Sequence, residues 1–147
     1  MFTRRDCLVA LAAAVSTAGA IALAQQAEPA GKSWAIDWNS IPAKTNPQGS
    51  GRAFFKGPTA TLNELEVHVT TLNPGQAPHP PHKHPNEEML IVKEGQLTVL
   101  INGDWKTYGP GSIIYLASNV LHGARNDGTV PVTYHVVGFK TAATPAQ

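Results

Sequence analysis

The second half of this chain is made of short apolar runs separated by turn residues, and that pattern constrains the fold most. Residues 61–72 alternate, with Leu65, Val67 and Val69 on one face, as in a half-buried strand. Asn102-Gly103 is a typical tight-hairpin sequence, and residues 108–111 form a Gly/Pro turn. Further short apolar runs lie at residues 89–92, 96–101, 112–116 and 130–139. Because no run has helical spacing, we predict an all-β sandwich or barrel.

The first 24 residues have the features of an export signal that is removed from the mature protein. Arg4-Arg5 precedes an uncharged apolar run over residues 8–24, and Ala22-Leu23-Ala24 offers a cleavage site before Gln25. Residues 3–8 resemble a twin-arginine export signal. The alternative is a retained anchor, for which the run is short. We expect cleavage, and a periplasmic or secreted protein.

Signal removal changes what charge and cysteine content imply. It takes two arginines and one aspartate, leaving nine charges of each sign, and it also takes Cys7, the only cysteine. A neutral mature chain gives no electrostatic reason to expect a nucleic-acid or membrane partner. Without thiolates, any metal site has to be built from histidines and carboxylates.

The mature chain divides into a lead-in, a barrel and a tail. Residues 25–58 mix aromatic residues with Pro and Gly, which favours an irregular arm whose rings pack on the domain. Residues 59–141 carry the strand pattern, and residues 142–147 form a C-terminal tail. Trp34 and Trp38 are expected to be packing residues.

One histidine-rich segment carries the chemistry. His82 and His84 lie two residues apart, so an extended backbone projects both imidazoles to one face. A turn at residues 85–86 would bring Glu88 back to the same point, and His122 would arrive from a separate strand. Three imidazoles and one carboxylate suit Mn²⁺, Fe²⁺, Ni²⁺, Cu²⁺ or Zn²⁺. The alternative is a histidine-rich loop that binds metal only adventitiously.

These residues resemble the two signatures of the cupin superfamily. The first reads His82-x-His84-x₃-Glu88-x₆-Gly95, and the second reads Gly111-x₅-Ala117-x-Asn119-x₂-His122-x₃-Asn126. The resemblance implies a jelly-roll β-barrel, a homodimer, and His82, His84, Glu88 and His122 as ligands of one divalent ion, with Mn or Fe the first choice. Ala117 and Asn119 replace the usual proline and glycine of the second signature; asparagine tolerates the left-handed bend expected there.

The sequence leaves other polar residues with open roles. His79, His135 and Arg125 are candidate catalytic residues; each also has a plainer explanation, as an exposed, a core and a solvated side chain respectively. His68 shares a strand face with Glu64 and Glu66, and that face is either solvent or the polar lumen of the barrel.

Three functions remain open at this point. The first is a metal-dependent enzyme acting on a small oxygenated molecule, with dioxygenase chemistry ahead of decarboxylation, isomerisation or hydrolysis. The second is a non-catalytic binder of such a molecule, and the third is a metal-holding periplasmic protein. Fold alone does not separate them.

Overall fold

A computed structural model describes residues 31–146 of the protein. The predicted signal over residues 1–24 and most of the lead-in before residue 34 lie outside the described residues. Within them the only helix is a single 3₁₀ turn, η1 (Trp38–Ser40), and all other regular structure is strand. No helix of the described part is long and apolar enough to cross a membrane.

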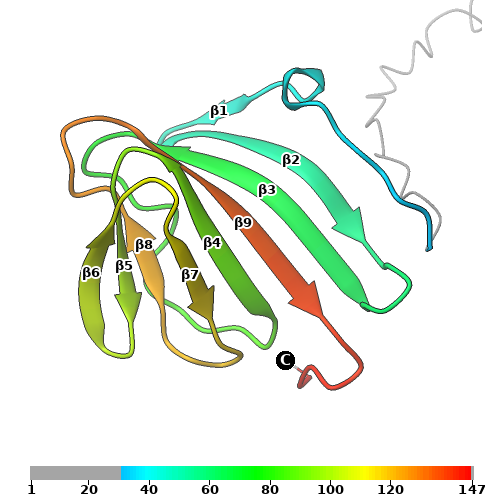
Figure 1. Ribbon diagram of the computed structural model, residues 1–147. Coiled ribbons are helices and arrows are strands. Elements are labelled where there is room, and N and C mark those ends of the chain that lie inside the picture. Colours follow the sequence, from blue (N-terminus) through cyan, green and yellow to red (C-terminus); the bar gives the residue numbers. More distant parts are fainter. Residues whose placement is uncertain (1–30, 147) are drawn as a thin grey trace, which may run out of the picture.

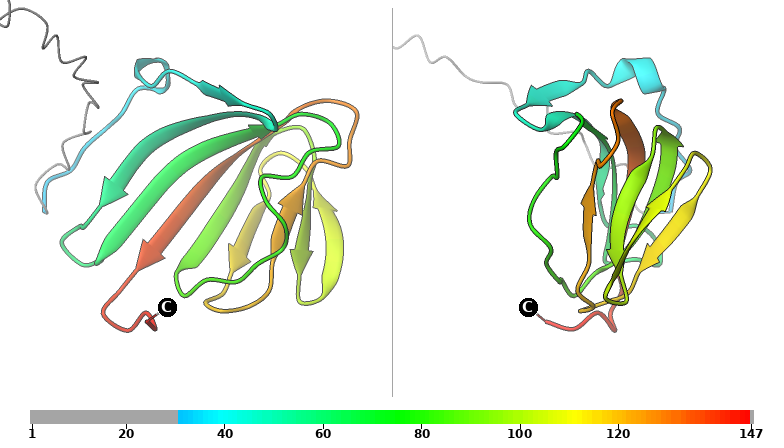
Figure 2. Two further views of the ribbon diagram at one scale, coloured as in Figure 1. Left: turned by 180° about the vertical axis from the view of Figure 1, so that it is seen from behind. Right: turned by 90° about the vertical axis from the view of Figure 1, so that its left-hand side faces the viewer.

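Over residues 31–146, nine strands form two antiparallel sheets that face each other (Figures 1 and 2). The larger sheet has the order β1-β2-β3-β9-β4-β7, and the smaller sheet has the order β6-β5-β8. The strands are β1 (Lys44–Asn46), β2 (Gly49–Gly57), β3 (Glu64–Leu72), β4 (Glu87–Glu94), β5 (Leu97–Ile101), β6 (Asp104–Tyr108), β7 (Ile113–Leu116), β8 (Gly123–Arg125) and β9 (Val132–Lys140). The predicted all-β cupin-type barrel is confirmed.

The hydrophobic core lies between the two sheets. Leu97 and Val99 from the smaller sheet are fully buried against side chains such as Leu90 and Val92 of β4 and Val132 of β9. These residues follow the period-two pattern of their strands, so one face of each strand supplies the core. The core fills one part of the barrel and leaves the space beside β3 to polar side chains.

The arm differs from the prediction, because residues 49–57 are not irregular. They form β2, which pairs with β3 along its length with one bulge between Ala53 and Phe55. A glycine is required at Gly49, where an added Cβ would lie 2.1 Å from the carbonyl oxygen of Thr71. The glycines in this segment suggested a loop, but at Gly49 the glycine instead allows the backbone of β2 to approach that of β3 closely.

The aromatic residues of the arm pack on the outer face of the larger sheet, as expected. Trp34 stacks on Phe55 with ring centroids 4.9 Å apart. Trp38 lies 5.8 Å from Phe54 and 6.1 Å from His135 by ring centroids. The predicted packing role of both tryptophans is thus confirmed.

The predicted turns are present. Asn102 and Gly103, between β5 and β6, both have positive φ, of 51° and 89°. Two successive positive φ values define the hairpin turn whose twist matches that of the flanking strands. Asn119 also has a positive φ of 57°, so it takes the left-handed bend predicted for it.

Candidate metal centre

The site is assembled by two loops that run side by side. The 73–86 loop connects β3 to β4, and the 117–122 loop connects β7 to β8. Backbone hydrogen bonds of 2.9 Å run in both directions between His82 and His122, and the amide of Asn119 donates to the carbonyl of His84 over 2.8 Å. The 73–86 loop therefore acts as an additional strand beside β8.

A buried asparagine extends this pairing towards β9. The amide of Gly75 donates to the carbonyl of Asn126, and the amide of Asn126 donates to the carbonyl of Gln76, both over 2.8 Å. The Asn126 side chain donates to the carbonyls of Leu72 and Val130. Asn126, the last residue of the second signature, is thus a structural residue that keeps the two loops in register.

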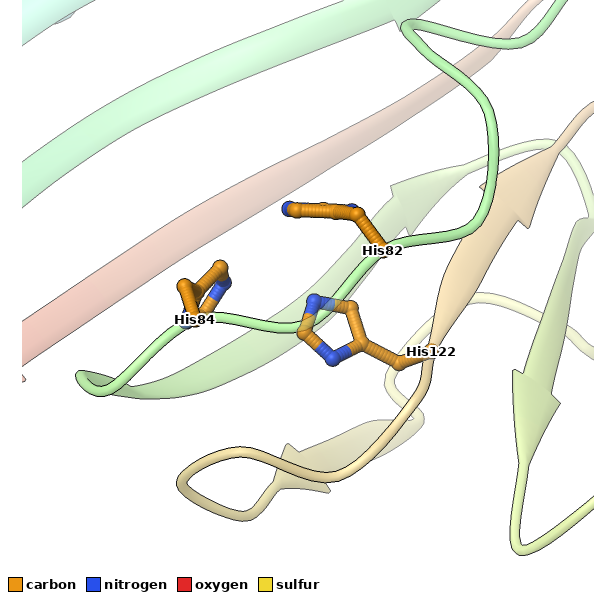
Figure 3. Close-up of side chains that lie close together, drawn as sticks. All are labelled: His82, His84 and His122. Carbon is orange, nitrogen blue, oxygen red and sulfur yellow. The ribbon is translucent and has the colours of Figure 1, made fainter. Parts of the chain in front are cut away.

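Three imidazoles meet where the loops pair (Figure 3). His82, His84 and His122 each offer a ring nitrogen, and these atoms all lie within 4.8 Å of one another. The ring of His122 is 4.7 Å from those of both His82 and His84 by centroid distance. His122 comes from a distant part of the chain, and it points towards the pair as predicted.

Backbone carbonyls orient two of the rings. Nδ1 of His84 lies 2.9 Å from the carbonyl oxygen of Asn86, and Nδ1 of His122 lies 2.9 Å from that of Val120. A carbonyl only accepts, so Nδ1 of each ring carries a proton, and Nε2 is the nitrogen that would bind an ion. Metal-binding histidines commonly have this second contact, which fixes the tautomer.

Two ring nitrogens of the cluster are buried without a hydrogen-bond partner in the described structure, Nδ1 of His82 and Nε2 of His122. Such atoms are costly to bury unless something binds them. Burial, followed by the neighbouring rings of His79, His122 and His84, lowers the pKa of His82 to about 4. His82 is therefore neutral near pH 7, and the lone pair of its unprotonated ring nitrogen is available. The cluster fits a transition-metal ion, which prefers neutral imidazoles.

Glu88 lies beside this cluster. It is the second residue of β4, after the predicted bend at residues 85–86. Its Oε2 lies 3.1 Å from Nε2 of His84 and is hydrogen-bonded to it. Its neighbour Glu87 projects to the opposite face, where its carboxylate accepts a hydrogen bond from the hydroxyl of Tyr115.

A cavity of about 180 Å³ opens onto the cluster. His82, His122 and Glu88 form one side of it. The remaining wall is part apolar and part polar, and is formed by His68, Thr70, Pro78, His79, Leu90, Leu116, Gly123, Ala124, Tyr134 and Val136. A hollow of about 270 Å³ is lined mainly by apolar residues such as Val120 and Leu121, and it meets the cluster only through His122. We place the chemistry in the smaller cavity because it contains the polar groups.

The other sequence candidates are placed differently. His79 lines the cavity, with its ring 4.2 Å from that of His82. His135 projects from the outer face of β9 towards Trp38 and is absent from the cavity wall, so the structure does not bring this candidate to the site. Tyr134 and Val136, its neighbours in the strand, face inward instead.

Arg125 is likewise absent from the cavity wall. Its Nε donates to Asp127 over 2.9 Å, and its guanidinium lies 4.0 Å from the ring centroid of Trp105. The adjacent Ala124 takes the inward position on β8. His68 does face the cavity, which answers the question that its alternating strand left open.

Comparison with known proteins agrees with this architecture. Residues 68–138 match the family model described as a cupin domain. The HTH-type transcriptional regulator SutR of Escherichia coli is 34% identical over 55 residues, which are 37% of this chain and 31% of that protein. The chain thus matches about a third of this curated relative's length.

Solved structures show the same fold. The cupin domain of an XRE family transcriptional regulator from Enterobacter cloacae superposes with a TM-score of 0.52 at 25% identity, covering 60% of this chain and 92% of that one. The polyketide cyclase RemF from Streptomyces resistomycificus superposes with a TM-score of 0.60 at 18% identity, covering 74% and 80% of the two chains. With two facing sheets, both signatures and these matches in agreement, this chain belongs to the cupin superfamily.

Proposed function

We propose that this cupin binds one divalent transition metal through His82, His84, His122 and Glu88, and acts on a small oxygenated molecule bound in the adjacent cavity. The observation that carries the proposal is the convergence of three imidazoles, two of which have a buried ring nitrogen without a hydrogen-bond partner among the described residues. Glu88 completes the set from β4, next to His84. The bound ion would supply Lewis acidity or activation of O₂.

The volume and the charges of the cavity restrict which small molecules could bind there. Its volume of about 180 Å³ is below the roughly 300 Å³ at which sites for drug-sized ligands begin. None of its lining residues is a lysine or arginine, and Glu88 contributes a negative charge. A phosphate or dicarboxylate is normally held by such cations. The ligand is therefore small, and neutral or singly charged.

Within this proposal we place dioxygenase-type chemistry first, with manganese or iron as the metal and zinc, nickel or copper as alternatives. Decarboxylase, isomerase or hydrolase activity comes next. The cyclase RemF supports an enzymatic role only through its fold. We also propose that residues 1–24 are an export signal, and that the protein works in the periplasm or outside the cell.

Non-catalytic binding is the second candidate, and the two regulator relatives favour it. One is described as a transcriptional regulator, and the other is the cupin domain of a protein described as a transcriptional regulator. A cupin that holds metal and ligand without turnover would serve as a sensor or carrier. We keep the expectation that this chain has no nucleic-acid partner of its own.

Elemental analysis of the natively produced protein tests the metal proposal. We expect close to one transition-metal ion per chain, and a fully folded product without metal would contradict the site. Oxygen uptake with a panel of small phenols and hydroxy-ketones then separates the candidates. Uptake supports a dioxygenase, whereas ligand binding without turnover supports the sensor or carrier.

A further inference from the structure

The polar wall provided by β3 and β9 is not explained by the metal centre. His68 and Thr70 project into the cavity from alternate positions of β3, and Tyr134 projects from β9. Burial raises the pKa of Tyr134, whose hydroxyl also has a side-chain hydrogen bond with Thr70. Tyr134 is therefore a neutral phenol at any physiological pH, and it does not act as a base.

The carboxylate of Glu66 lies beside the imidazole of His68. Its Nδ1 is buried and lies 3.3 Å from Oε1 of Glu66, in ion-pair range but without hydrogen-bond geometry, and it has no hydrogen-bond partner among the described residues. The other oxygen of Glu66, Oε2, accepts a hydrogen bond from Lys56 over 2.6 Å. Glu66 therefore lies between the ammonium group of Lys56 and the imidazole of His68. A carboxylate beside Nδ1 favours a proton on that nitrogen and a lone pair on Nε2.

Other charges around His68 are paired. Lys140 lies 3.0 Å from Glu64, and Lys56 lies 3.9 Å from the same oxygen of Glu64. Across the cavity, Glu88 is engaged with His84. The remaining titratable groups of the wall are His79, His82, His122 and Tyr134. Of these, His79 lies edge-on to His82 and belongs to the cluster side of the cavity.

We propose that His68 is the proton acceptor for the molecule bound in the cavity, with Glu66 as its positioning residue. The ligand class is then a small neutral compound with an ionisable hydroxyl, such as a phenol, an enol or a hydroxy-ketone. The hydroxyl proton passes to Nε2 of His68 and the O–H electron pair stays on the ligand as an oxyanion. The resulting imidazolium is stabilised by the carboxylate of Glu66. This inference rests on the proposed function, because the oxyanion would be held at the three-histidine centre.

The coloured phenol 4-nitrocatechol is a suitable probe, because its visible spectrum reports how many of its hydroxyls are ionised. Wild type, His68→Gln and Glu66→Gln are loaded with metal, assayed for metal content and titrated with the probe across pH. Glutamine keeps a hydrogen-bonding amide but cannot take up the proton. His135→Gln is the matched control, since this histidine lies on the same sheet but faces outward.

We expect His68→Gln to retain its metal, to bind the probe about tenfold more weakly, and to ionise the second hydroxyl only at higher pH than wild type. Glu66→Gln should shift that ionisation in the same direction by less, and His135→Gln should match wild type. Identical spectra for wild type and His68→Gln across the pH range would overturn the inference. So would loss of metal in His68→Gln equal to that in His122→Gln, because His68 would then support the cluster.

A wild type that retains no metal would contradict the proposed function instead. The same titration is then made on metal-free protein. Equal binding of the probe by wild type and His68→Gln there would overturn the role of His68, and weaker binding by the variant would support it.

Discussion

At the level of single residues, two adjacent glutamates at the start of β4 have different surroundings. Glu88 faces inward beside Nε2 of His84, whereas Glu87 faces outward and accepts a hydrogen bond from the hydroxyl of Tyr115. We expect Glu88→Ala to weaken metal retention at least about tenfold, because it removes the only carboxylate that residues 31–146 place next to the cluster. Glu87→Ala should retain metal like wild type. Dialysis against a chelator followed by elemental analysis measures both, and equal losses would mean that the carboxylate was wrongly assigned.

Residue spacing was enough to predict the four proposed ligands but not the residues that orient them. His82 and His84 follow the period of an extended chain, and the signature placed His122 beside them. The carbonyls of Asn86 and Val120, which fix two of the tautomers, are backbone atoms that any residue could provide. The inward direction of His68 was not predictable either, because strand alternation defines two faces without saying which one meets the cavity.

At the level of elements, the strongly alternating runs were predicted and the weakly patterned ones were not. The run over residues 61–72 became β3, and the Asn102-Gly103 turn lies between β5 and β6. The strand β2 was missed, since its glycines suggested a loop and their close approach to β3 is a tertiary effect. The three-residue β8 was also missed, because its pairing with β5 comes from non-local contacts.

Two glycines in loops and turns of the barrel form a matched pair for testing element geometry. Gly75 and Gly95 have nearly equal φ values, of 73° and 75°. A Cβ on Gly75 would meet nothing within 4 Å, whereas one on Gly95 would lie 2.5 Å from the carbonyl oxygen of Pro131. Gly75→Ala should therefore cost only the left-handed strain of about 1–2 kcal/mol.

Gly95→Ala should cost the same strain and roughly 1–3 kcal/mol more, because the turn after β4 has to move away from the segment before β9. Urea denaturation of the two variants measures the difference in the free energy of unfolding. Equal destabilisation would show that the backbone at Pro131 moves aside freely, which would contradict the close packing described here.

At the level of the whole molecule, the outer face of the larger sheet bears on the proposed homodimer. Ile113 and Tyr115 on the edge strand β7 are 65% and 47% exposed. Apolar side chains exposed side by side on a sheet edge favour association. If the dimer forms there, Ile113→Glu should shift the protein to monomer in sedimentation analysis, with metal content unchanged. If the wild type sediments as a monomer, the homodimer that the family resemblance implies would be contradicted.

The stability of the metal-free molecule should depend on pH through His82. Its pKa in the folded protein is about 4, below the ordinary value of 6.5, chiefly because of burial. Between these two values the unfolded chain binds more protons than the folded one, so acid favours unfolding. The contribution of His82 is fully present above its unfolded pKa. It falls as the pH drops from 6.5 towards 4, and below that there is no further loss from this residue.

Urea denaturation of metal-free protein at several pH values between about 4 and 7 measures this slope. The His82→Asn variant should show a shallower slope, because the group whose pKa differs between the two states is gone. In the metal-loaded protein the slope should be steeper than in the metal-free one, since protonated imidazoles cannot bind the ion and acid also removes its stabilising effect. Slopes of wild type and variant that coincide would show that the folded protein does not hold His82 neutral in this pH range.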